Sequence, residues 1–112
     1  MKEPYAHLLP ILRQVAREHG YALGFHGSGE RDCDLIAAPW VEDASDAEVL
    51  IEALRVAMNG HISQSLNDDP HDFMQRNPQP KPHGRLAWAI RPLDDNPEAR
   101  LYFDISVMPK KG

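Results

Sequence analysis

The stretch that most constrains the fold is Gly27-Ser28-Gly29-Glu30-Arg31-Asp32-Cys33-Asp34-Leu35-Ile36-Ala37-Ala38-Pro39-Trp40. It opens on a glycine turn and runs into an apolar segment that is typical of a strand. Because side chains alternate faces along a strand, Asp32 and Asp34 point the same way, with Cα atoms roughly 6–7 Å apart. At an effective dielectric near 20, carboxylates at this spacing repel by about 3 kcal/mol. The pair therefore needs a cation, a basic side chain or open water, and a hard divalent cation is one natural partner.

Length and composition indicate one globular domain spanning residues 1–112. The net charge of -5 argues against a general nucleic-acid or anionic-membrane surface. No apolar run approaches the ~20 residues of a membrane span, and the N-terminus has no signal-peptide pattern. Cys33 is the single cysteine, which excludes an internal disulfide and favours the cytoplasm as the compartment.

Helical spacing of apolar residues predicts two helices. The first covers residues 8–18 and either starts with Pro10 in its first turn or is kinked there. The second begins with a capping box formed by Ser45 and Glu48. Its apolar stripe comprises Val49, Leu50, Ala53, Leu54, Ala57 and Met58, and Asn59-Gly60 is expected to end it.

Alternating apolar side chains predict four strands, at residues 21–26, 33–38, 86–91 and 100–107. The last two are expected to form a hairpin. The simplest packing is a mixed or antiparallel four-stranded sheet with both helices on one face, which is an α+β fold. Asp104 lies in the middle of the last strand, where a lone charge is unfavourable to bury. If this strand neighbours the second one, Asp104 joins Asp32 and Asp34 in one acidic cluster.

Residues 61–84 are expected to form a long loop, because prolines, asparagines and aspartates dominate them. Their aspartates and histidines match no metal-ligand spacing, so a solvated loop is favoured. Near the end of this loop Lys81, His83 and Arg85 form a compact basic group just before a strand. They are candidates for contacts with phosphate or with an acceptor, and simple solvent exposure is the alternative.

A glycine-serine pair, an Asp-x-Asp strand and a third aspartate on a later strand resemble the nucleotidyltransferase fold of the DNA polymerase beta superfamily. Its small stand-alone members are nearest in size, and the resemblance covers about half of the chain. The strings HGSGERDCDLIAAPW, KPHGR and YFDISVMP are also similar to small uncharacterised phage and prophage proteins. That second resemblance covers most of the chain and implies no activity; a phage origin would place the protein in the host cytoplasm.

The superfamily resemblance implies a role for each of the three aspartates. Asp32 and Asp34 would bridge two Mg²⁺ (or Mn²⁺) ions that bind the triphosphate of an NTP. Asp104 would hold the catalytic metal and help to deprotonate the hydroxyl of an unknown acceptor.

The resemblance also implies that Gly27 and Ser28 contact phosphate oxygens. In the family a longer insert, usually with a helical turn, follows this pair, whereas only residues 29–31 separate it from Asp32 here. A tight hairpin would then replace the helix N-terminus that helps to bind phosphate. Arg31 is the candidate that substitutes as a phosphate contact, or it pairs with the acidic cluster.

Three functions remain open at this point. The first is a metal-dependent nucleotidyltransferase, and the second is a catalytically inactive relative, either a phage accessory factor or an antitoxin-like protein, that acts by binding another protein. The third is a metal-dependent phosphoesterase or nuclease that uses the same aspartates. A plainer interpretation of the acidic pair is an ion pair with Arg31, Arg85 or Arg91.

Overall fold

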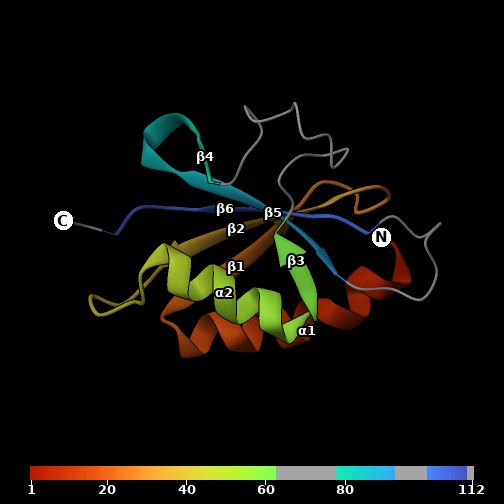
Figure 1. Cartoon of the computed structure of the whole chain (residues 1–112), viewed down its shortest axis with the longest axis horizontal. Helices are drawn as coiled ribbons and strands as arrows, with labels where there is room; N and C mark the ends of the chain where they lie inside the picture. Colours follow the sequence, from red (N-terminus) through yellow and green to blue (C-terminus); the bar gives the residue numbers. More distant parts are fainter. Residues whose placement is uncertain (63–77, 93–100, 111–112) are drawn as a thin grey trace.

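The computed structural model describes residues 1–62, 78–92 and 101–110 of the chain. In chain order the elements are α1 (Glu3–Glu18), β1 (Tyr21–His26), β2 (Cys33–Pro39), α2 (Ala47–Ala57), β3 (Gly60–Ile62), β4 (Gln79–Pro80), a 3-10 turn (Pro82–Gly84), β5 (Leu86–Pro92) and β6 (Phe103–Val107). Both helices lie against one face of a mixed sheet (Figure 1). This arrangement confirms the expected α+β class with two helices on one side.

The sheet has the strand order β1-β2-β6-β5-β3, and β4 pairs with β5. β2 and β6 run parallel, and the other described pairs are antiparallel. The expected four strands are therefore too few, because β3 and β4 also join the sheet. With three and two residues, these strands are too short to leave an alternating pattern in the sequence. They also give structure to both ends of the predicted loop 61–84, of which residues 63–77 lie outside the described part.

The core lies between the helices and one face of the sheet. From the helices it takes Tyr5, Leu9, Leu12, Ala16, Leu50, Ile51 and Leu54. From the four longer strands it takes Tyr21, Leu23, Cys33, Leu35, Ala37, Trp88, Ile90, Phe103, Ile105 and Val107. The rings of Tyr5 and Phe103 meet edge to face with centroids 5.1 Å apart, which ties α1 to the middle of the sheet. The alternation predicted for these strands is thus confirmed, and it turns the intervening side chains to the opposite face.

α1 starts earlier than the apolar stripe suggested. Pro4 lies in its first turn, and the helix continues through Pro10 to Glu18. Because α1 begins at Glu3, Pro10 lies inside the helix, and its expected place in the first turn is wrong. At this position Pro10 lacks the N–H for one helical hydrogen bond. The helix continues because Tyr5 and Leu12, on either side of this proline, are both buried.

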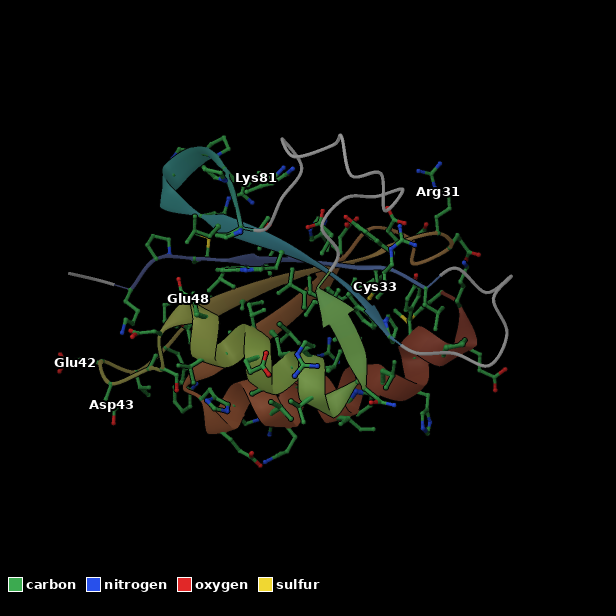
Figure 2. All side chains as sticks on the ribbon, viewed as in Figure 1. Arg31, Cys33, Glu42, Asp43, Glu48 and Lys81 are labelled. Carbon is green, nitrogen blue, oxygen red and sulfur yellow. The ribbon has the colours of Figure 1, made fainter. Side chains whose placement is uncertain are left out.

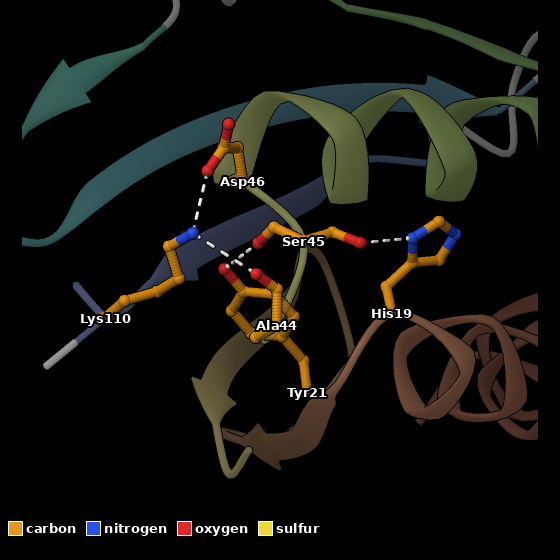
Figure 3. A network of polar contacts seen from close by, with 6 residues as sticks. All are labelled: His19, Tyr21, Ala44, Ser45, Asp46 and Lys110. Carbon is orange, nitrogen blue, oxygen red and sulfur yellow. Dashed lines mark hydrogen bonds and ion pairs between the residues drawn. The ribbon is translucent and has the colours of Figure 1, made fainter. Parts of the chain in front are cut away.

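The start of α2 differs from the predicted capping box. The N-cap is Asp46, and no side chain caps the helix. Instead, the Ser45 hydroxyl lies 3.0 Å from Nδ1 of His19, and the Ser45 carbonyl accepts a hydrogen bond of 2.7 Å from Tyr21 (Figure 3). Lys110 Nζ forms an ion pair with Asp46 at 2.8 Å. Partners from α1, β1 and the C-terminal segment therefore outcompete the local cap.

α2 ends at its predicted stop signal but departs from its predicted apolar stripe. The last helical residue is Ala57, the C-cap is Met58, and Asn59 follows with a φ of +50°, before Gly60 begins β3. Val49, expected in the core stripe, is 50% exposed. Of the helices in the described segments, neither has the length and apolar character that a bilayer crossing requires.

Candidate functional site

The sheet face opposite the helices carries the predicted aspartates. Parallel pairing registers Asp34 of β2 with Asp104 of β6. On either side, His26 registers with Asp34 and Ala89 registers with Asp104, so one row crosses β1, β2, β6 and β5. Neighbouring strands lie about 4.8 Å apart, and partners in register share a face. Asp34 and Asp104 are therefore side by side, as expected for a last strand that neighbours β2.

The electrostatics of Asp104 reflect this crowding. Burial raises the pKa of its carboxyl, and the nearby charge of Asp34 raises it further, with a smaller contribution from Asp32. Lys81 and His26 act in the opposite direction. A half-buried carboxyl that is pushed toward its protonated form beside a second carboxylate favours a bound cation.

Asp32 lies just before β2, at the exposed end of the same face. The N–H of Cys33 donates to the Tyr102 carbonyl at 2.9 Å, which extends the β2–β6 pairing toward this end. Burial raises the pKa of the Tyr102 hydroxyl to about 12, helped by Asp104 and Asp32. The guanidinium carbon of Arg91 lies 5.6 Å from the centre of the Tyr102 ring. Aromatic, basic and acidic groups thus share this end of the face.

These carboxylates are the oxygen ligands that a divalent cation prefers. Among residues 1–62, 78–92 and 101–110, no group of three or more His, Cys, Asp or Glu side chains is arranged to hold a metal ion. The structure brings Asp34 and Asp104 together but does not assemble the three aspartates into one ligand set. Mg²⁺ commonly binds through one or two carboxylates and completes its shell with phosphate oxygens and water. The pair therefore fits an ion that arrives with a phosphate ligand.

The glycine-serine turn lies against this pair. Gly27 has a φ of +86°, and a Cβ there would lie 3.5 Å from Oδ2 of Asp34. The Ser28 hydroxyl accepts a hydrogen bond of 3.2 Å from the N–H of Glu30, within its own turn. The Glu30 carboxylate pairs with the amino group of Met1 at 2.9 Å. No helix lies between Ser28 and β2, so the expected tight hairpin is confirmed and Ser28 is directed to its own backbone.

Arg31 belongs to the same hairpin. Its carbonyl accepts a hydrogen bond of 2.6 Å from the Tyr5 hydroxyl, which also accepts one of 2.9 Å from the N–H of Tyr102. This hydroxyl therefore links the segments that lead into β2 and β6. The Arg31 side chain is exposed and lies well apart from Lys81 in Figure 2. The two basic candidates approach the face from different sides.

The predicted basic group divides into two parts. Lys81 acts on the carboxyl of Asp104, whose pKa it lowers. His83 lies in the 3-10 turn with a φ of +67°, and Nε of Arg85 donates to the carbonyl of Pro82 at 3.2 Å. His83 and Arg85 therefore shape the turn that carries Lys81, and no described contact joins either of them to the aspartates.

Sequence reasoning missed His26 as a member of the row. Alternation along β1 places it on the face opposite Tyr21 and Leu23, but only the pairing of β1 with β2 brings it to Asp34. Alternation along residues 100–107 likewise places Tyr102 on the face of Asp104 but indicates no role for it.

In comparisons with known proteins, no protein-family model, curated protein or solved structure matches the chain.

Proposed function

We propose that this chain is a nucleotidyltransferase-like protein that depends on a divalent cation and transfers a nucleotidyl group from an NTP to an unknown acceptor. The observation that supports the proposal most is the parallel pairing of β2 with β6, which sets Asp34 beside Asp104. The superfamily pattern calls for a third carboxylate next to an Asp-x-Asp strand, and this is the place it would occupy. Both described helices lie on the other side of the sheet, and Asp34 and Asp104 are partly exposed.

Each residue then has a role in this proposal. Asp34 and Asp104 would hold Mg²⁺ or Mn²⁺, with Asp32 as a further oxygen donor at the exposed end. The ion would neutralise the phosphates and orient them for in-line attack. Asp104 would also help to deprotonate the attacking hydroxyl. Lys81, the cation that acts on Asp104, supplies a charge for a phosphate oxygen.

A second candidate is a non-catalytic protein of the same fold that acts by binding another protein. Two observations favour it. The described aspartates do not form a three-ligand metal site, and Ser28 is bonded within its own hairpin instead of being presented to a phosphate.

Calorimetric titration separates the candidates. ATP, GTP, CTP and UTP are titrated in turn into the wild type, with Mg²⁺ or Mn²⁺ and then with EDTA. We expect one NTP to bind only with the metal, and Asp34→Asn and Asp104→Asn to abolish this binding. Asp43→Asn is the matched control, because Asp43 is an exposed aspartate in the loop before α2, far from the row (Figure 2).

Two results would overturn the assignment. Failure to bind any NTP with metal would favour the non-catalytic candidate. Phosphodiester cleavage without consumption of an NTP would instead indicate a metal-dependent phosphoesterase or nuclease.

A further inference from the structure

α2 has two apolar faces, of which the core covers one. Leu50, Ile51 and Leu54 are buried. On the outer side, Val49 and Val56 are 50% and 62% exposed. An exposed valine is a weaker helix former than alanine, glutamate or lysine, and it gains no burial there. A helix with apolar residues on both sides is normally covered on both sides.

The outer apolar residues of α2 line a groove against α1. The groove has a volume of about 670 Å³. Val49, Ala53 and Val56 form the α2 wall at helical spacing, and Val15 contributes from α1. An open apolar depression between two helices can receive the side chains along one face of a third helix, which is a recurring mode of recognition.

The rim of this groove is acidic. Glu18, Glu48 and Glu52 border it. Glu52 is paired with Arg55, whose Nε lies 2.9 Å from the carboxylate. Within the described part of the chain, Glu18 and Glu48 have no ion-pair partner. His19, also on the rim, is bonded through Nδ1 to a serine hydroxyl. The groove therefore combines an apolar floor with uncompensated negative charge.

We propose that the groove between α1 and α2 binds a basic amphipathic helix of a partner protein. Its apolar row would lie against Val49 and Val56, and its lysines or arginines would reach Glu18 and Glu48. A second copy of this chain fits poorly, because a two-fold contact would bring these carboxylates together in a chain of net charge -5. An anionic bilayer is repelled for the same reason.

This inference goes beyond the proposed nucleotidyl transfer and does not depend on it. The helices separate the groove from the aspartate row, which lies on the other face of the sheet (Figure 1). Loss of NTP binding and loss of helix binding can therefore be observed independently.

The test uses a synthetic amphipathic peptide of leucine and lysine, about 18 residues long or about five helical turns. Amide NMR shifts of the whole chain are followed during titration, and the affinity is measured by fluorescence anisotropy. We expect shifts at Val15, Val49, Ala53 and Val56, and an affinity that falls as salt rises. A leucine-glutamate peptide of the same pattern should bind at least tenfold more weakly.

Substitutions assign the binding to the groove. Val56→Glu should weaken binding of the leucine-lysine peptide at least tenfold, and Glu48→Gln should weaken it about threefold at low salt. Val49→Ser is a second apolar variant that adds no charge. The controls are Trp40→Ser, which removes a side chain that is 64% exposed elsewhere, and Glu42→Gln in the loop before α2 (Figure 2). Both should bind as the wild type does.

Several outcomes would overturn the proposal. They are absence of binding, shifts centred on the open sheet face, or equal affinity in the folded Val56→Glu and Val49→Ser variants. Concentration-dependent dimerisation that Val56→Glu abolishes would show that a second copy covers the groove instead.

Discussion

Replacement of Asp104 by asparagine tests the electrostatic basis of the candidate site. Asp34 and Asp104 are partners on adjacent strands whose backbones lie about 5 Å apart, and we take this spacing as the distance between the two charges. At that distance two charges repel by about 3 kcal/mol at an effective dielectric of 20, and by about 1 kcal/mol in water. Both residues are partly exposed, so screening favours the lower figure. We expect Asp104→Asn to raise the free energy of unfolding by about 1 kcal/mol at neutral pH without divalent ions.

The pH dependence follows from the direction of the pKa shift. Burial and Asp34 raise the pKa of Asp104 in the folded state. Between the unfolded and folded pKa values the native state binds more protons, so wild-type stability falls as the pH rises through this window. The gain from Asp104→Asn should be complete above the folded pKa. It should disappear below the unfolded pKa, where the carboxyl is protonated in both states.

Urea denaturation, followed by circular dichroism in EDTA from about pH 3 to about pH 7, measures this gain. Asp43→Asn is the control and should change the free energy of unfolding by less than about 0.5 kcal/mol. The gains of Asp34→Asn and Asp104→Asn should not add, because each variant removes the same repulsion. A loss of about 1 kcal/mol or more in Asp104→Asn would refute the reasoning, since it would show that the fold stabilises this carboxylate.

Three further predictions concern the packing of the fold. Tyr5→Phe should lower the free energy of unfolding by about 1–3 kcal/mol in urea denaturation, because the Arg31 carbonyl and the Tyr102 N–H lose their partner; an unchanged value would contradict this. Burial raises the pKa of the Cys33 thiol to about 11, so DTNB at about pH 8 should label this cysteine only in unfolded protein, and rapid native labelling would be contrary. Gly20→Ala should lower the free energy of unfolding by about 2 kcal/mol or more, because Gly20 has a φ of +84° and a Cβ there would lie 2.6 Å from a neighbouring side chain. Thermal unfolding measures the last effect, and a melting temperature equal to that of the wild type would disprove it.

The strands were the most predictable part of the fold. Alternation along residues 21–26 and 33–38 defined β1 and β2 to within a residue, and alternation along β2 and β6 placed Asp34 and Asp104 opposite their buried neighbours. The pattern is clear because one face of each strand is buried by the helices. Nothing local determines that β6 lies between β2 and β5, so the acidic cluster could only be stated as a condition.

Helix ends were less predictable, since long-range contacts decide them. Ser45 has the residue type of a cap, yet His19 and Tyr21 compete for its polar groups. Pro10 is typical of a helix start, but α1 begins earlier in the chain, because side chains on both sides of Pro10 are buried. The same reason explains Val49, because periodicity on α2 does not reveal which of two apolar faces meets the sheet.

The basic candidates show a further limit. The spacing of Lys81, His83 and Arg85 is that of residues on one face of a strand. The 3-10 turn between β4 and β5 interrupts this alternation. His83 has a φ of +67°, which the alternation of the three residues does not indicate. Of these three basic residues, only Lys81 acts on the pKa of Asp104.

The parallel junction of β2 with β6 has a consequence for how the protein is made. Asp34 and Asp104 lie side by side, although 70 positions (34 to 104) separate them in the sequence. A chain emerging from the ribosome carries the first member of the pair early, and the second appears 70 positions later (34 to 104). Contacts this remote form late, after the intervening chain has closed on itself. Nascent chains and C-terminally shortened products would thus contain two aspartates of the motif and still lack the pair.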